Sequence, residues 1–155
     1  MIRFALPLVL LTGCVTPTPE ATQSVTFGAN GVIVGDAGLE ISFGRAQDGA
    51  VTAMSQLIGP PNQTYDNQEC GAGPITTVSW DGVDMLFMFG DFRGWVLSAP
   101  FDTSIGVTVG MTPEPDTVLQ DTSLGQEFGI GGVYALIATG DTIDTVWAGV
   151  SCFFR

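Results

Sequence analysis

The chain has 155 residues, of which 16 are acidic and only 4 are basic, so its formal net charge at pH 7 is −12. It contains no histidine and no lysine, which excludes nucleophilic sites built on a Ser-His or Cys-His pair, Schiff-base lysines and Walker A phosphate loops. The scarcity of positive charge also argues against a nucleic-acid partner, because binding to the phosphate backbone requires lysine or arginine.

The composition fits one folded domain that is rich in strands and loops. Hydrophobic residues make up 45% of the chain, which is enough to build a core. Charged residues make up only 13%, while there are 21 glycines and 9 prolines. Many glycines and prolines with few charges favour short strands joined by turns over a helical bundle.

The N-terminus has the order of an export signal, with Arg3 before an apolar run over residues 4–11. The run is much shorter than the about 20 residues of a membrane-spanning helix. Residues 11–14, Leu-Thr-Gly-Cys, resemble the lipobox of bacterial lipoprotein precursors, in which a peptidase cuts before a cysteine that carries a diacylglyceryl group. The resemblance implies a signal peptide at residues 1–13 and a lipidated Cys14. The alternatives are an ordinary signal peptide or a buried free cysteine.

A lipid on Cys14 would hold the mature protein on a membrane, since two or more acyl chains anchor firmly at about 0.8 kcal/mol per buried CH₂. Anionic head groups would repel the acidic chain, so the lipid has to supply the attachment. We therefore expect a lipid-anchored, periplasm-facing protein of the cell envelope. Val15 follows the cysteine, where in some bacteria an aspartate marks retention in the inner membrane. By resemblance to that rule, Val15 favours the outer membrane.

A spacer and three strands are predicted next along the chain. Residues 14–24 are rich in proline and threonine and almost free of apolar side chains, which is typical of an extended spacer. The folded domain is expected at residues 25–155. Apolar runs on either side of Asn30-Gly31 predict two strands joined by a tight turn. Alternation of apolar and polar residues over 39–43 predicts a third strand.

An internal repeat is visible when the chain is shifted against itself by 66 residues. Residues 39–59 then align with residues 105–125, each as an alternating strand, a glycine, a short helix and a Leu/Ile-Gly stop. In the first copy, Asp48 is the expected cap of a helix that ends before Gly59. In the second copy, Thr112 is the expected cap. Strands follow each helix.

The predicted fold class is therefore α+β, with two tandem repeats at about residues 39–98 and 105–155, each a short helix packed on antiparallel strands. Cys70 lies in the first repeat and Cys152 in the second. An even number of cysteines besides Cys14 in an exported protein favours one disulfide over a metal pair. Such a bond would staple the repeats together, and buried free thiols are the alternative.

Three stretches carry a family resemblance: residues 92–95 (Phe-Arg-Gly-Trp), residues 105–112 and residues 148–153. They resemble an uncharacterised family of small exported bacterial lipoproteins with tandem helix-plus-strands repeats. That family is similar in pattern to the beta-lactamase inhibitory protein family. The resemblance covers roughly residues 39–155 and implies the same repeated fold. Only scaffold glycines and apolar positions match, so no binding residue is carried over.

Aromatic residues are concentrated within nine positions of the first repeat. They are Phe87, Phe89, Phe92 and Trp95. A continuous apolar run such as residues 85–89 is typical of a strand buried on both faces, which favours a place in the core. The alternative is a partly exposed partner patch, because aromatic residues are frequent anchors at interfaces.

Carboxylates are the only plentiful reactive groups. Asp81, Asp84 and Asp91 bracket a predicted hairpin, and a glycosidase would use two carboxyls about 5 to 9.5 Å apart. Aspartate is, however, also favoured at turns for its local hydrogen bonds. The chain has no Asp-Thr/Ser-Gly motif and no EF-hand loop, and residues 129–134 lack the third glycine of a dinucleotide-binding loop. We therefore expect no catalytic residue, no metal and no cofactor.

These patterns together predict a non-enzymatic envelope lipoprotein that acts as a protein-binding or structural module. Its expected contacts are the membrane, through the lipid on Cys14, and an envelope protein. A periplasmic inhibitor or chaperone of an envelope enzyme is the second hypothesis, and a carboxylate-based hydrolase is the third.

Overall fold

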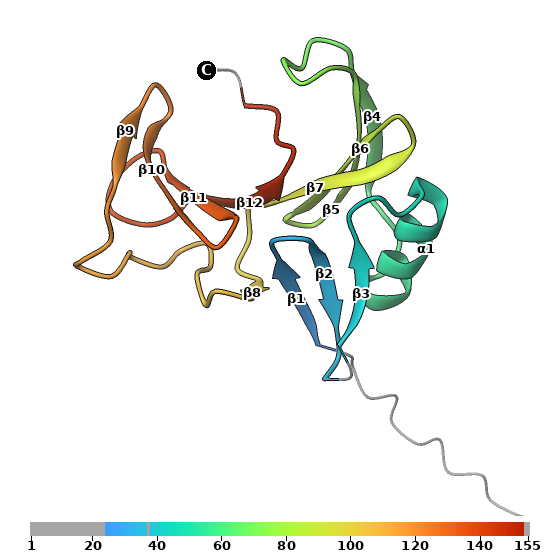
Figure 1. Cartoon of the computed structure of the whole chain (residues 1–155), viewed down its shortest axis with the longest axis horizontal. Coiled ribbons are helices and arrows are strands. Elements are labelled where there is room, and N and C mark those ends of the chain that lie inside the picture. The colour runs from blue at the N-terminus through green and yellow to red at the C-terminus, as the bar shows by residue number, and fades with distance from the viewer. Residues whose placement is uncertain (1–23, 37, 154–155) are drawn as a thin grey trace, which may run out of the picture.

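The computed structural model describes residues 24–36 and 38–153. The predicted signal peptide, Cys14 and nearly all of the predicted spacer lie outside the described residues. Figure 1 shows the described chain as two antiparallel-rich sheets and a helix. In this part of the chain no helix is both long enough and apolar enough to cross a membrane.

The elements follow one another along the chain as a run of short strands that is interrupted once by a helix. They are β1 (Val25–Gly28), β2 (Gly31–Val34), β3 (Leu39–Ser42), α1 (Gln47–Ile58), β4 (Gln63–Asn67), β5 (Ile75–Trp80), β6 (Val83–Met88), β7 (Asp91–Leu97), β8 (Asp102–Thr103), β9 (Gln120–Thr122), β10 (Gly125–Ile130), β11 (Val133–Ile137) and β12 (Thr145–Gly149). The fold is therefore mixed but mostly β.

The smaller sheet has four strands in the order β3-β2-β1-β8. The predicted hairpin is present, because β1 and β2 form an antiparallel pair. Its two-residue turn is Ala29-Asn30, one position before the expected Asn30-Gly31, since Gly31 already pairs with Gly28. β3 pairs antiparallel with β2, so the third predicted strand is also confirmed. β8 completes the sheet by pairing parallel to β1.

The larger sheet has eight strands in the order β4-β5-β6-β7-β12-β11-β10-β9. It consists of two runs of four consecutive antiparallel strands, β4–β7 and β9–β12, which meet where β7 pairs with β12. The hairpins β5–β6 and β10–β11 are alike, since Trp80 pairs with Val83 and Ile130 pairs with Val133 around two-residue turns. Val83 thus corresponds to Val133, a shift of 50 residues instead of the expected 66.

The first predicted helix forms, with one difference at its start. α1 ends before Gly59, which has φ 90°, as predicted. Its N-cap is Ala46, which makes no side-chain capping bond, and Asp48 lies in the first turn instead of at the cap. An acidic residue in the first turn still stabilises the positive end of the helix dipole. Ala50 and Met54 are the buried residues of α1, which packs against β3 and β7.

The second predicted helix does not form, so the expectation of one helix in each repeat is wrong. Residues 112–119 are turns and irregular chain. The physical reason lies in Pro115, because a proline disfavours the α conformation of the residue before it, here Glu114. The helix start expected at Thr112 is therefore blocked within its first turn.

The core lies between the two sheets and is centred on Trp95. This side chain is fully buried, its indole N–H donates to the carbonyl oxygen of Gly28 at 2.8 Å, and its ring packs edge-on against Phe27. Phe92 is also fully buried and packs against the rings of Phe43 and Phe87. The contacts of Trp95 with β1 and of Phe92 with Phe43 join the larger sheet to the N-terminal elements. The contact between Phe92 and Phe87 fills the space between the two sheets.

Three of the four aromatic residues singled out in the sequence therefore belong to the core. Phe87, Phe92 and Trp95 are at most 1% exposed, so they do not form a partner patch. Phe89, in contrast, is 88% exposed in the turn between β6 and β7. The pairing of β6 with β7 has a register shift beside Phe87, so that Phe92 and Trp95 both face the core although they are three positions apart. Phe89 lies in the tight turn and points away from the core.

The two halves of the larger sheet meet at a close approach of backbones. Gly94 of β7 faces Gly149 of β12, and the backbone N–H of Val150 donates to the carbonyl of Arg93 at 2.9 Å. A Cβ atom on Gly94 would collide with the carbonyl oxygen of Val150, and one on Gly149 would collide with that of Arg93 and with the Phe43 ring. Both positions therefore require glycine.

The C-terminal segment continues from this junction over the face of the larger sheet that is turned away from the smaller sheet. Figure 1 shows it between the β4–β6 end and the β9–β11 end of the sheet. The predicted disulfide is confirmed: Cys70 and Cys152 are bonded, with Cα atoms 5.5 Å apart and 82 positions apart in sequence. With Ile75 and Leu86 the bonded cysteines form a second small apolar cluster.

Gly94→Ala should lower the free energy of unfolding by about 1–3 kcal/mol, the usual cost of forcing extra atoms into close packing. Urea unfolding of the purified protein measures the effect. Gly71→Ala is the matched control, because a Cβ atom there meets nothing within 4 Å. The control should stay within about 0.5 kcal/mol of the native sequence. Equal effects of the two substitutions would contradict the tight junction.

Candidate functional site

Exposed large apolar side chains are concentrated near one end of the larger sheet. Those in the described residues are Leu39, Tyr65, Phe89, Met111, Val118, Leu119, Ile130 and Tyr134. Four of these eight come from the segment between residues 118 and 134, which forms β9, β10 and the start of β11. Single exposed apolar residues are ordinary on protein surfaces, but a group of them on one element cluster marks a contact surface.

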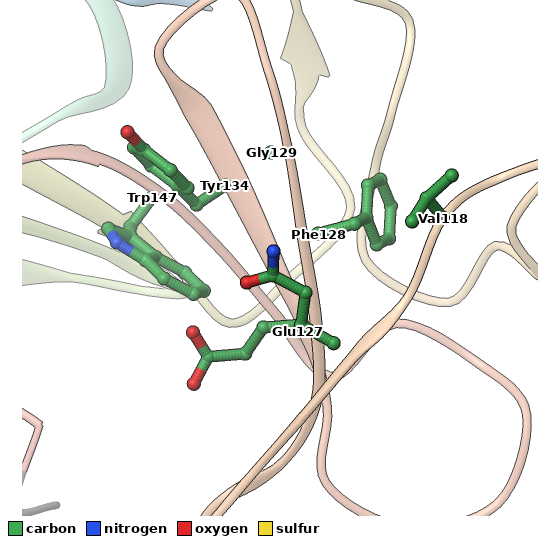
Figure 2. Close-up of a pocket in the computed structure, with 7 residues that line it drawn as sticks. Val118, Glu127, Phe128, Gly129, Tyr134 and Trp147 are labelled. Carbon is green, nitrogen blue, oxygen red and sulfur yellow. The ribbon is translucent and has the colours of Figure 1, made fainter.

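A pocket of about 530 Å³ opens within this group (Figure 2). We call it the β9–β12 pocket. Its lining residues are Val118, Gln120, Glu127, Phe128, Gly129, Tyr134 and Trp147. In Figure 2 the rings of Tyr134 and Trp147 lie on one side of Glu127, and Phe128 and Val118 lie on the other. Glu127 and Phe128 are consecutive residues of β10, so their side chains leave the strand on opposite faces, and Phe128 belongs to the core.

The pocket exists because β9 is short. The pairing of β9 with β10 ends at Gln120 and Glu127, whereas β10 itself continues to Ile130. The chain before β9 leaves the sheet at this point and carries Val118, which is 81% exposed. The outer edge of β10 beyond Glu127 is therefore not covered by β9, and the pocket opens beside it.

The aromatic wall is built by cross-strand register. Tyr134 faces Gly129 on one side and Trp147 on the other. A Cβ atom on Gly129 would lie 2.7 Å from the Tyr134 ring, so this glycine makes room for the ring to lie across β10. Tyr134 and Trp147 stack with ring centroids 5.7 Å apart and an interplanar angle of 22°.

Trp147 fixes the position of the more exposed Tyr134. Trp147 is only 4% exposed, and the edge-on ring of Phe153 packs against it with centroids 4.9 Å apart. Tyr134 is 46% exposed. An aromatic side chain that is held from one side and open on the other loses little conformational entropy when a partner covers it.

Glu127 places a carboxylate in the pocket. It is 9% exposed, and its Oε1 accepts a hydrogen bond from the hydroxyl of Thr122 at 2.9 Å. The surrounding sequence is acidic, since residues 94–153 contain seven acidic residues and no lysine or arginine. They are Asp102, Glu114, Asp116, Asp121, Glu127, Asp141 and Asp144. Among the described residues, those that follow Arg93 therefore carry only negative charge.

The carboxylates considered for catalysis do not line this pocket. Asp91 forms an ion pair with Arg93 at 3.0 Å. Asp81 is exposed in the turn before β6. Asp84 lines a separate cavity of about 120 Å³ beside Cys152. Among residues 24–36 and 38–153, no group of three or more His, Cys, Asp or Glu side chains is placed to hold a metal ion.

Asp144 has a structural role in the loop between β11 and β12. The Asp144 carboxylate accepts a hydrogen bond from the backbone N–H of Ala138 at 2.7 Å, which closes the loop between β11 and β12. Arg45 lines a cavity of about 280 Å³ between β3 and α1. Both residues lie outside the lining of the β9–β12 pocket.

The residues of the β9–β12 pocket were not singled out from the sequence. Residues 129–134 drew attention only through their glycines. What joins Gly129, Tyr134 and Trp147 is their register on three neighbouring strands, which no local pattern encodes. Alternation over residues 133–137 is a weak signal that Tyr134 lies opposite the core face.

Comparisons with protein-family models, with curated proteins and with solved structures find no match for this chain. The β9–β12 pocket is therefore interpreted from its own geometry. It offers one open aromatic face, apolar walls and a single carboxylate. Such a set binds by burying apolar surface and by electrostatic attraction.

Phe89→Asn should raise the free energy of unfolding by about 1 kcal/mol. Phe89 has φ 53°, a left-handed conformation that costs a bulky residue about 1–2 kcal/mol and that asparagine adopts more readily. Its side chain is 88% exposed, so little packing is lost. Chemical unfolding measures the change, and Tyr65→Asn, at an exposed strand position, is the control without a gain. A loss of stability at position 89 would contradict the strain.

Proposed function

We propose that the protein is a lipid-anchored bacterial envelope protein that acts by binding another protein and is not an enzyme. The observation that carries the proposal is the β9–β12 pocket, where Tyr134 is held open to solvent on the buried ring of Trp147. The exposed side chain of Val118, which also lines the pocket, extends the apolar surface beside it.

The physical argument rests on what anchors protein interfaces. Tyrosine and tryptophan are enriched among the residues that contribute most to binding, because they bury much apolar area with few rotatable bonds. The stack on Trp147 orients Tyr134 before a partner arrives, which lowers the entropy lost on binding. A pocket of about 530 Å³ is large enough to receive a side chain of the partner.

The membrane anchor is the second part of the proposal. Its support is the resemblance of residues 11–14 to a lipobox, followed by a Pro/Thr-rich spacer. A lipid at Cys14 would hold the domain in the envelope, periplasm-facing, with the outer membrane favoured by Val15 as above. A binding surface on a tethered domain meets partners in the same compartment at a raised effective concentration.

An inhibitor or chaperone of an envelope enzyme is the alternative within the same class. The observation that favours it is the similarity of the β5–β6 and β10–β11 hairpins in the two halves of the larger sheet. We propose that the halves descend from one duplicated unit whose second copy has no helix. This fits the resemblance to the tandem repeats of the beta-lactamase inhibitory protein family.

Cys14→Ser should abolish incorporation of a palmitate analogue during growth and release the protein from the membrane fraction. The reason is that the thioether to the diacylglyceryl group needs the cysteine sulfur. In-gel detection of the analogue measures the change. Thr16→Ser, two positions further on, is the control that keeps the label. Unchanged labelling of Cys14→Ser would contradict the anchor.

A photoreactive phenylalanine analogue at position 118 should give a discrete cross-linked product with an envelope protein in living cells, because Val118 rims the β9–β12 pocket. The same analogue at position 65 is the control. Tyr65 is similarly exposed to Tyr134, 43% against 46%, but lies on β4 at the far edge of the sheet. Mass spectrometry identifies the product. No product at position 118, or the same products at both positions, would contradict the proposal.

A further inference from the structure

The cavity of about 280 Å³ between α1 and β3, the edge strand of the smaller sheet, is lined mainly by apolar side chains (Figure 1). We call it the β3–α1 groove. Its apolar lining residues are Val34, Leu39, Ile41, Ala53 and Leu57. Leu39 is 64% exposed at the mouth of the groove. The groove therefore offers apolar surface that the described part of the chain leaves uncovered.

The two walls of the groove each come from one face of an element. Val34 and Leu39 pair directly across β2 and β3, so they share a face of the smaller sheet. On α1, Gly49, Ala53 and Leu57 are four positions apart and therefore form a line along the helix. From Gly49 to Leu57 this line measures about 12 Å, at a rise of about 1.5 Å per residue. The groove is therefore bounded by two turns of helix and an edge strand.

An arginine lies at the Gly49 end of this line. Arg45 lines the groove, and a Cβ atom on Gly49 would lie 3.3 Å from its Nε, so the arginine side chain lies against the first turn of α1. Within residues 24–36 and 38–153, Arg45 forms no ion pair, whereas Arg93 is paired with Asp91. In a chain with 16 acidic residues, the guanidinium of Arg45 is thus left to attract an anion.

Two further polar residues line the groove, and neither neutralises Arg45. Glu40 lies on β3 between two of the apolar lining residues, so its side chain leaves the strand on the face opposite to theirs. Gln56 carries no charge. The groove therefore combines one positive charge at one end with mainly apolar walls along the rest.

A linear molecule with a carboxylate at one end and an alkyl chain behind it complements this arrangement. The planar guanidinium of arginine matches a carboxylate, with which it forms two parallel hydrogen bonds. Each CH₂ group that leaves water for the apolar walls contributes about 0.8 kcal/mol. With C–C bonds of about 1.5 Å, an extended chain of about ten carbons spans the groove. A peptide would have to bring polar backbone groups against the same walls, which is unfavourable. The chemistry of the groove therefore favours an alkyl chain.

We propose that the β3–α1 groove binds a fatty acid of medium chain length. Its carboxylate pairs with Arg45, and its alkyl chain lies between α1 and β3 and extends toward Leu39 and Leu57. The groove shares no lining residue with the β9–β12 pocket, so this binding site is independent of the protein contact proposed above. It gives α1 and the smaller sheet a ligand of their own.

The experiment uses decanoic acid that carries a diazirine at the end remote from the carboxyl group. The lipidated full-length protein in detergent micelles is irradiated with this probe, and mass spectrometry of peptides locates the label. With the carboxylate on Arg45, the diazirine lies at the other end of the groove. The label should therefore be found on β3 or on the last turn of α1, and an excess of unmodified decanoate should reduce it.

Matched variants test the role of the guanidinium. Arg45→Gln should reduce labelling of the groove by at least about threefold, the effect of losing an exposed ion pair. Arg93→Gln removes the same charge from an arginine outside the groove and should leave the labelling unchanged. The methyl ester of the probe has the same chain without the negative charge, and it should label the groove at least about threefold less than the acid. Glu40→Gln should not lower the labelling, because it removes a negative charge.

Equal labelling of Arg45→Gln and Arg93→Gln, or by the acid and its ester, would overturn the proposal, because binding would then not depend on the guanidinium. Label on other apolar surfaces in place of β3 and α1, or no label at all, would overturn it as well. Urea unfolding of each variant checks that it folds like the native sequence, as expected for substitutions of exposed side chains. The cross-linked product at position 118 tests the proposed function separately, so either can fail while the other stands.

Discussion

At Gly94 and Gly149 the backbones of β7 and β12 approach so closely that neither residue can carry a side chain. This contact joins two runs of four strands into one sheet, and it directs the chain after β12 across the sheet, so that Cys152 reaches Cys70. Trp147 lies two residues before Gly149, and its ring therefore has a fixed place beneath Tyr134. The architecture and the candidate site both depend on this junction.

The same face of the larger sheet is used in two ways. Over β5 to β7 the disulfide and the C-terminal segment close it with a small apolar cluster around Ile75 and Leu86. A bond that closes a loop of this length stabilises the fold by up to about 4 kcal/mol in the chain-entropy model. Over β10 to β12 the face stays open at Tyr134. The closed end gives rigidity, and the open end provides the surface that we propose binds a partner.

Local sequence signals predicted what depends on neighbouring residues or on simple counting. The hairpin of β1 and β2, the end of α1 at Gly59 and the pairing of Cys70 with Cys152 are confirmed. The second predicted helix does not form, because Pro115 disfavours the α conformation of Glu114. The prediction gave more weight to the repeat alignment than to this local effect. The β9–β12 pocket was missed for a different reason. It depends on register between strands far apart in the sequence, where a shift of one residue would turn each side chain to the other face.

The central claim is that the β9–β12 end of the sheet faces a partner. Its most direct test compares the hydrogen exchange of the anchored protein in its native envelope with that of the purified protein. The account predicts slower exchange in the envelope for backbone amides of residues 117–135, beside the pocket, and no change for residues 63–77 at the opposite edge. Equal exchange in the two samples, or protection confined to residues 63–77, would contradict it.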